Sequence, residues 1–245
     1  MNPKENYQKL KDLVSGEGIS LFGVADIREI RKDFLLPKEV AEKFDFAISL
    51  GYRLSQSILE TLVDRPNQIY FFHYQRVNVF LDTVALKVTQ FIQNDGSVPF
   101  GLSLRARPHH PEELKEGYQA LPIPASQVVD WQNLKGHLSH KQIAHLAGLG
   151  WQGKNNLLVN PNYGSQVRYV TILTNYPLTT NHPLNGSCRE CKSCIAVCPA
   201  GAIQENSFSL EKCHQKLKEF IKTEKISQQI CGICLKVCPG KNRLK

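Results

Sequence analysis

The sequence contains no long hydrophobic run, and no stretch approaches the ~18 consecutive apolar residues of a transmembrane helix. Its first residues, MNPKENYQKLKDL, hold neither the apolar segment of a secretory signal nor a twin-arginine pair. Neither an H-E-x-x-H zinc motif nor a G-x-S-x-G nucleophile motif occurs. These absences predict a cytoplasmic protein with no membrane association, and they argue against the zinc peptidase and serine hydrolase classes.

The composition is that of an ordinary folded protein, with 42% hydrophobic and 21% charged residues in 245. It excludes a disordered tail, a collagen-like fibre and a miniature disulfide scaffold. The length suits one large domain, or a domain followed by a small module, at ~100–200 residues per domain.

Charge and cysteine are both concentrated near the C-terminus. From Cys188 to Lys245 there are 11 Lys and Arg against 5 Asp and Glu, which is +6 of the formal net charge of +8. All eight cysteines lie in the same segment. A basic segment can contact nucleic acid, or it can offset the negative charge of thiolate-bound iron–sulfur clusters.

Four of the cysteines follow the spacing C-x2-C-x2-C-x3-C-P, at Cys188, Cys191, Cys194, Cys198 and Pro199. This is the ligand run of bacterial ferredoxins, whose fourth cysteine binds the other cluster. Two zinc sites are the alternative, because two C-x2-C pairs also suit zinc knuckles. Zinc does not account for the complete run with its proline, and a cytosolic setting disfavours disulfides. The motif therefore predicts [4Fe–4S] clusters.

The motif repeats in part 40 residues further along the chain. Cys191, Cys194, Cys198 and Pro199 are matched by Cys231, Cys234, Cys238 and Pro239. Cys188 has no match at this offset, and Cys213 on a helix-like stretch takes its place. If the last cysteine of each run binds the cluster of the other run, as in two-cluster ferredoxins, the eight thiols divide into two sets. One cluster is predicted to bind Cys188, Cys191, Cys194 and Cys238, and the other Cys198, Cys213, Cys231 and Cys234.

The first 187 residues predict mixed helices and strands. Helices are expected over residues 5–14, within 37–44, over 68–94 and over 139–147, with Ser139 as the N-cap of the last. Apolar positions of the long helix are Phe72, Val79, Ala85, Val88 and Ile92. Strands are expected over residues 22–27, 46–52, 99–104, 156–160 and 167–174, the last two around a turn at 161–164. Residues 106–136, with four prolines, are expected to be irregular.

The glycine-rich run 148–154 fits both G-x-G-x-x-G and G-x-x-x-x-G-K. Both nucleotide-binding motifs need a strand before and a helix after, whereas here the expected order is helix, then strand. The glycines are instead expected to let backbone approach something large and flat, or to adopt positive φ in a tight turn. Trp151 either stacks there or belongs to the core.

The block Ala147–Asn155, the turn at 161–164 and the paired cysteine motif resemble the epoxyqueuosine reductase family and cytoplasmic relatives of reductive dehalogenases. The resemblance is clear over residues 136–239. It implies an α+β fold with a nitroreductase-like N-terminal domain (1–180), followed by a small ferredoxin-like double [4Fe–4S] module (181–245). No counterpart of the family's C-terminal helical-repeat extension is expected, because the sequence stops seven residues after Cys238.

The resemblance also implies a cobalamin that the two clusters reduce, and in the family this chemistry removes an epoxide oxygen from a modified base of tRNA. The residues implied to lie against the corrin are Gly148, Gly150, Trp151, Gly153, Lys154 and Asn155. Asp130 is the candidate for the family's proton-donating aspartate, followed by His73 and Tyr74. The implied partners are tRNA and a reductant such as a ferredoxin or a flavodoxin.

Two other functions stay open at this stage. One is a ferredoxin-type electron-transfer protein without cobalamin, whose first 187 residues dock a redox partner or another cofactor. The other is an RNA-binding or scaffold protein with structural clusters, whose basic face would comprise Lys212, Lys216, Lys218, Lys222 and Lys225. The motifs favour an iron–sulfur oxidoreductase that passes electrons to cobalamin.

Overall fold

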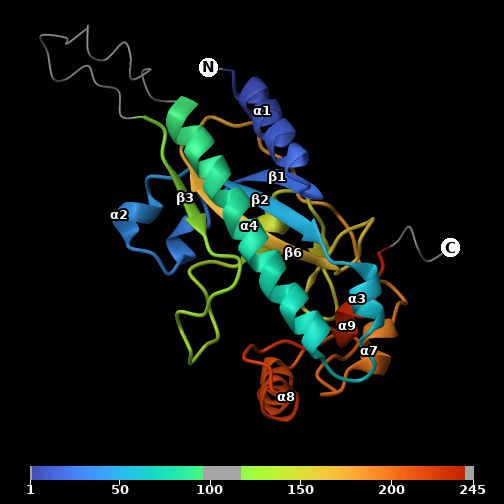
Figure 1. Ribbon diagram of the computed structural model, residues 1–245. Helices are drawn as coiled ribbons and strands as arrows, with labels where there is room; N and C mark the ends of the chain where they lie inside the picture. Colours follow the sequence, from blue (N-terminus) through green and yellow to red (C-terminus); the bar gives the residue numbers. More distant parts are fainter. Residues whose placement is uncertain (1, 96–116, 241–245) are drawn as a thin grey trace, which may run out of the picture.

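The structure is a computed structural model that describes residues 2–95 and 117–240. It mixes helices and sheet, as expected, and helices cover both faces of a central four-stranded sheet (Figure 1). The strand expected over residues 99–104 lies outside the described residues. Within those ranges, no helix is long and apolar enough to cross a membrane.

The central sheet is antiparallel throughout. Its order is β1 (Leu21–Asp26), β2 (Phe46–Arg53), β6 (Val167–Thr174) and β3 (Ala120–Ile123). The expected strands over 22–27, 46–52 and 167–174 are confirmed to within about a residue at each end. Since helices pack on both faces, β2 and β6 are buried along most of their length, and this is why both read as nearly continuous apolar runs.

One face of the sheet is covered by the long helix α4 (Gln68–Asp95), with α1 (Pro3–Gly16) beside it. The expected helix over 68–94 is therefore confirmed. Ala85, Val88 and Ile92 are buried against the sheet as expected, but Phe72 is 48% and Val79 66% exposed. All five are apolar positions of the helix, but only three of them lie on the stripe that faces the sheet.

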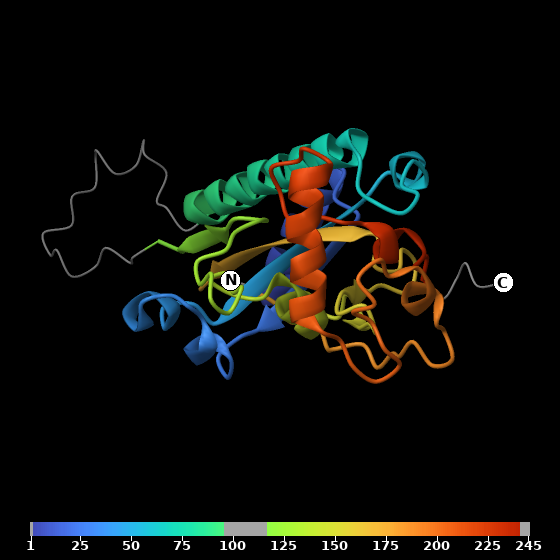
Figure 2. The same ribbon diagram turned by 90° about the horizontal axis from the view of Figure 1, so that it is seen from below.

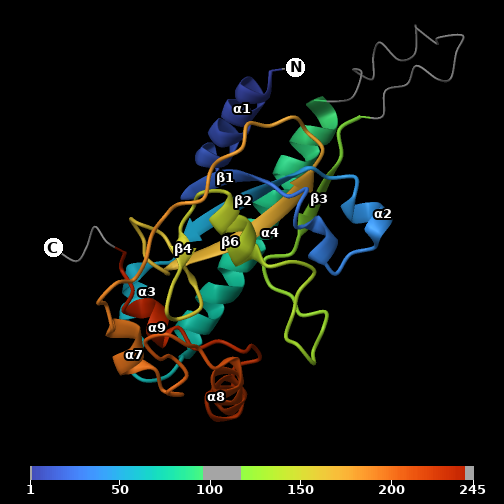
Figure 3. The same cartoon turned by 180° about the vertical axis from the view of Figure 1, so that it is seen from behind.

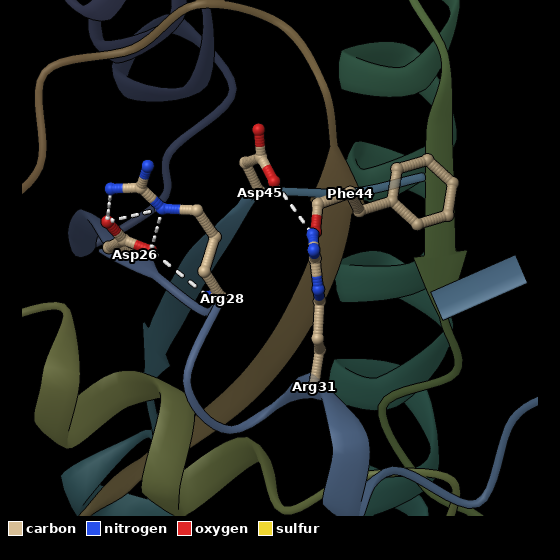
Figure 4. Close-up of polar contacts among 5 residues, drawn as sticks. All are labelled: Asp26, Arg28, Arg31, Phe44 and Asp45. Carbon is tan, nitrogen blue, oxygen red and sulfur yellow. Dashed lines mark hydrogen bonds and ion pairs between the residues drawn. The ribbon is translucent and has the colours of Figure 1, made fainter. Parts of the chain in front are cut away.

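The opposite face is covered by α6 (His140–Leu146), whose expected N-cap is confirmed: the Ser139 hydroxyl accepts from the N–H of Gln142 (3.3 Å). The connection from β1 to β2 holds η1 (Arg31–Asp33) and α2 (Lys38–Ala41), and α2 lies within residues 37–44, where a short helix was expected. Figure 4 shows how this connection is fixed: the Arg31 guanidinium donates to the Phe44 carbonyl (2.8 Å) and to the Asp45 carboxylate (2.7 Å).

Two expectations about strand pairing were wrong. Residues 106–136 were expected to be irregular, but β3 pairs with β6, and Pro122 is tolerated because β3 is an edge strand. The strand expected over 156–160 is reduced to β5 (Leu158–Val159), which pairs with β4 (Trp151–Gln152) in a separate hairpin and not with β6. A further short helix, α3 (Gln56–Glu60), follows β2.

The chain then returns along the N-terminal elements before reaching the cysteines. Seen from behind, this orange segment passes α1 and β1 (Figure 3). The Asn181 side chain accepts from the N–H of Val24 (2.8 Å), and the N–H of Thr179 donates to the Pro3 carbonyl (3.3 Å). Three helices follow: α7 (Ser193–Val197), α8 (Leu210–Thr223) and α9 (Ile233–Lys236).

The half-buried His140, whose two ring nitrogens both have partners, predicts a pH dependence of stability. Its Nδ1 lies 2.8 Å from the Thr171 hydroxyl and its Nε2 2.9 Å from the Pro124 carbonyl. Burial lowers the pKa of His140 to about 4. The unfolded chain therefore binds the proton first, and stability is expected to fall by about 2 kcal/mol between pH 7 and pH 5. Denaturant unfolding at both pH values should show this loss in the parent protein but not in His140→Gln; an equal loss in both would contradict it.

Candidate functional site

The first cysteine run, residues 188–198, forms a loop around α7 and is called the first ligand loop. The N–H of Cys191 donates to the carbonyl of Cys188 (2.9 Å) and closes a tight turn. Cys194 lies in α7 and is buried, whereas Cys198 ends the helix in extended backbone. That ending follows from Pro199, because a residue before proline avoids the helical region.

The sequence repeat is also a structural repeat. Cys234 occupies in α9 the place that Cys194 has in α7, and Cys238 follows α9 as Cys198 follows α7. The two helices pack against each other. The N-cap of α9 is Gly232, whose φ of +81° suits glycine. A Cβ there would lie 2.8 Å from side-chain atoms of both Leu62 and Tyr70, so the loop packs tightly on the start of α4.

The first thiol group consists of Cys188, Cys191, Cys194 and Cys238, which the structure brings together around one cavity. The cavity has a volume of about 480 Å³, and all four cysteines line it. Burial, followed by charge on Cys238, Cys188 and Cys191, raises the pKa of Cys194 to about 11. Cys238 thus lies with the three cysteines of the earlier loop, although 40 or more residues of sequence separate it from them.

The second thiol group consists of Cys198, Cys213, Cys231 and Cys234. Burial raises the pKa of Cys234, and charge on Cys231, Cys198 and Cys213 raises it further. Cys213 comes from α8, which lies apart from the sheet in Figure 1 and passes in front of it in the view from below (Figure 2). The N–H of Ala202 points at the sulfur of Cys198 (3.4 Å), the kind of hydrogen bond that tunes a cluster.

These eight thiols fit iron–sulfur clusters as a donor set. All are free, and none pairs in a disulfide. Within the described ranges, no three histidine, cysteine or acidic side chains are placed to hold a single metal ion. Because burial raises the pKa of several thiols, they stay protonated until metal binding displaces the protons.

The glycine-rich run packs on this chain's own backbone. Gly148 has a φ of +73°, and a Cβ there would lie 2.6 Å from the His182 carbonyl oxygen. At Gly150 a Cβ would overlap the Val159 carbonyl, and at Gly153 it would lie 2.6 Å from the Val159 side chain. Close packing and one tight turn therefore account for the three glycines.

The other three residues of the block lie at the first thiol group. Trp151 is 5% exposed and, with Asn155, lines the cavity beside the cysteines. The Asn155 amide donates to the Ser165 hydroxyl (3.1 Å). The Lys154 ammonium donates to the carbonyls of Arg189 (2.8 Å) and Cys191 (3.2 Å), inside the ligand loop.

The three candidate proton donors are held in different places. The Asp130 carboxylate accepts from the amide and N–H of Asn133 (2.7 and 3.0 Å), and these bonds lower its pKa. His73 Nε2 accepts from the N–H of Ser55 (3.2 Å), and burial lowers the His73 pKa. The Arg168 guanidinium lies over the Tyr74 ring, and its central carbon is 4.4 Å from the ring centroid.

A polar cluster around Arg168 escaped the sequence reasoning. Its Nε and Nη2 donate to the Asn78 carbonyl oxygen (3.1 and 3.0 Å), and Nη2 also donates to the Ala125 carbonyl (2.9 Å). Among the described residues, the amide nitrogens of Asn78 and Gln127 are buried without a partner. One sequence feature could have revealed this cluster: β6 is an apolar strand that contains a single arginine, on the face that α4 covers.

The fold and the thiol grouping define a class: an iron–sulfur protein with two clusters. Residues 187–241 match the 4Fe-4S double cluster binding domain family, and every cysteine of the chain lies in this range. The prediction of two [4Fe–4S] clusters is confirmed.

More particularly, the chain is similar to epoxyqueuosine reductases. That of Bacillus anthracis is 38% identical over 137 residues, which are 52% of this chain and 36% of the relative. That of Listeria monocytogenes is 35% identical over 114 residues, 42% of this chain and 30% of the relative. The chain spans about a third of the length of these curated relatives.

Solved structures share the fold. The catabolic reductive dehalogenase NpRdhA, in complex with 3-bromo-4-hydroxybenzoic acid, matches with a TM-score of 0.72 at 18% identity, over 97% of this chain and 32% of that one. The epoxyqueuosine reductase from Streptococcus thermophilus matches with a TM-score of 0.55 at 17% identity, over 97% and 66%. At these identities the likeness concerns the fold alone.

Proposed function

We propose that this protein is an iron–sulfur oxidoreductase that passes electrons from two [4Fe–4S] clusters to a bound cobalamin, for a reductive reaction of the epoxyqueuosine reductase kind. The first thiol group would bind cluster 1 and the second cluster 2. The observation that carries the proposal is the cavity that Trp151 and Asn155 share with the first thiol group. It joins the cluster ligands to the sequence block that resembles these reductases.

We also propose a boundary near residues 180 and 181, between a nitroreductase-like domain and the ferredoxin-like module. A cytoplasmic location suits a chain with eight free thiols. For electron supply we propose a ferredoxin or flavodoxin. The exposed lysines of α8, the helix that carries Cys213, suit an acidic surface of such a carrier.

Cobalamin is supported by the chemistry of the unpartnered groups. Cobalamin carries amide side chains around the corrin ring and a phosphate in its nucleotide loop, all of which accept hydrogen bonds, and the amide nitrogens of Asn78 and Gln127 are donors without a partner in the described ranges. These two, Arg168 and the wall residues Trp151 and Asn155 would hold the cofactor. When bound, cobalamin supplies a strongly reducing, nucleophilic cobalt. A solved reductive dehalogenase is described as suggesting B12-dependent dehalogenation.

For proton donation we propose Asp130 ahead of His73 and Tyr74, because both of those side chains already support the fold. The bonds from Asn133 keep Asp130 ionised in this arrangement, so it would take up a proton once its loop releases it. One Bacillus subtilis epoxyqueuosine reductase is described with its catalytic loop swung out of the active site. Another such reductase was solved with a modified tRNA stem loop, so tRNA is the substrate class we propose.

Protein purified without oxygen, loaded with hydroxocobalamin and freed of excess is expected to retain cobalt at about one per chain beside about eight irons. Asn78→Asp keeps an oxygen that accepts from Arg168, replaces the unpartnered donor by an acceptor and adds one negative charge. Loss of one hydrogen bond is expected to weaken cobalamin binding about five- to tenfold. Asn94→Asp, at the exposed end of the same helix, is the matched control.

Full iron without any retained cobalt would contradict the proposal. It would favour instead the electron-transfer protein, for which a redox partner would then be sought. Equal cobalamin affinity in Asn78→Asp and Asn94→Asp would remove Asn78 from the binding site while leaving the cofactor itself in place.

A further inference from the structure

Lys154 stands at the tip of the β4–β5 hairpin, and the hairpin is held firmly. The N–H of Gly153 donates to the Leu157 carbonyl (2.8 Å), and the Lys141 ammonium donates to the Asn156 carbonyl (2.6 Å). Next to Lys154, the buried Asn155 is bonded to Ser165. The hairpin therefore offers the Lys154 ammonium from a fixed base.

What that ammonium contacts is the first ligand loop. Its Nζ lies 2.8 Å from the Arg189 carbonyl oxygen and 3.2 Å from the carbonyl oxygen of Cys191 itself. The same stretch is closed by the bond from the Cys191 N–H to the Cys188 carbonyl. One cation thus fixes two peptide planes in the loop that supplies three of the four thiols of the first group.

We propose that Lys154 is a positioning residue of cluster 1, which orients the ligand loop and raises the reduction potential of that cluster. A [4Fe–4S] cluster with four thiolates carries about −2 charge when oxidised and one more negative charge when reduced. A cation held close by stabilises the reduced form more than the oxidised form. The effect is large where burial weakens screening, as around Cys194 and Trp151.

The chain offers a matched control in Lys192. It belongs to the same ligand loop and is the N-cap residue of α7, but its ammonium pairs with Glu205 (3.0 Å), and its side chain is 59% exposed. Lys154 and Lys192 therefore carry the same charge near the same thiols. Only Lys154 bonds to the loop's backbone carbonyls.

The test is an anaerobic redox titration of the holoprotein, followed by electron paramagnetic resonance, with iron counted on each sample. In Lys154→Met, the ratio of reduced to oxidised cluster 1 at a fixed ambient potential is expected to fall about tenfold, a shift of about 59 mV for a one-electron couple. Lys192→Met is expected to shift the reduction potential of cluster 1 far less. Lys154→Arg, which keeps the cation, is expected to have the potential of the parent protein.

Loss of about four irons in Lys154→Met, restored in Lys154→Arg, would also support the positioning role. An unchanged potential with full iron, or an equal change in Lys192→Met, would overturn it, as would iron loss that Lys154→Arg does not restore. The proposal rests on the proposed ligand sets and not on cobalamin. A parent protein with fewer than eight irons would count against those sets, and cobalt is not read in this experiment.

Discussion

Replacing both Cys194 and Cys238 with alanine is expected to leave about four irons per chain, as many as either single replacement leaves. Both thiols line the same cavity, so loss of one already abolishes the cluster that they share. Replacing Cys194 and Cys198 together is expected to leave no iron, although these two lie only four residues apart. Iron and sulfide are counted after anaerobic reconstitution.

The opposite pattern would contradict the exchange of fourth ligands. If each cluster took its cysteines from one stretch of sequence, Cys194→Ala with Cys198→Ala would leave four irons, and Cys194→Ala with Cys238→Ala none. The comparison does not depend on cobalamin, substrate or reductant, because only the metal content is read.

Gly164→Ala is expected to cost about 2–4 kcal/mol of stability, through strained backbone and a steric clash. Gly164 has a φ of +58°, and a Cβ there would overlap the carbonyl of Cys238. The same turn receives the end of the cluster segment: the N–H of Ser165 donates to the Cys238 carbonyl (3.2 Å). Denaturant unfolding of the iron-loaded protein should show the loss, together with faster release of iron to a chelator.

Gly201→Ala is the matched control for this prediction. Gly201 has nearly the same φ, +55°, but a Cβ there would meet nothing within 4 Å. Its cost is expected to be that of the backbone alone, about 1 kcal/mol. Equal losses in the two variants would show that the contact between Gly164 and Cys238 does not hold the segment in place.

Local pattern was sufficient to predict much of this molecule. β1, β2, β6, α4 and the Ser139 cap could be located because hydrophobic period and capping chemistry are properties of neighbouring residues. The cysteine motif identified the cluster type for the same reason: its spacing is set within one loop.

Features set by distant partners could not be predicted in this way. β3 contains a proline, and Ala120 lies opposite Thr174, more than 50 residues away. The bonds from Lys154 to the carbonyls of Arg189 and Cys191 join residues that are 35 and 37 positions apart. The bond between Arg168 and Asn78 spans 90 residues. Backbone carbonyls and buried amides leave no periodic signature in sequence.

The exchange of Cys198 and Cys238 between the two thiol groups has a consequence for how this segment can change. Neither cysteine run, 188–198 or 231–238, contains a complete set of ligands, so neither could be moved or deleted as an independent module. An insertion between α8 and α9 would alter the reach of both centres at once. With these ligand sets, loss of one cysteine would spare one cluster, whereas loss of either whole cysteine run would remove ligands from both.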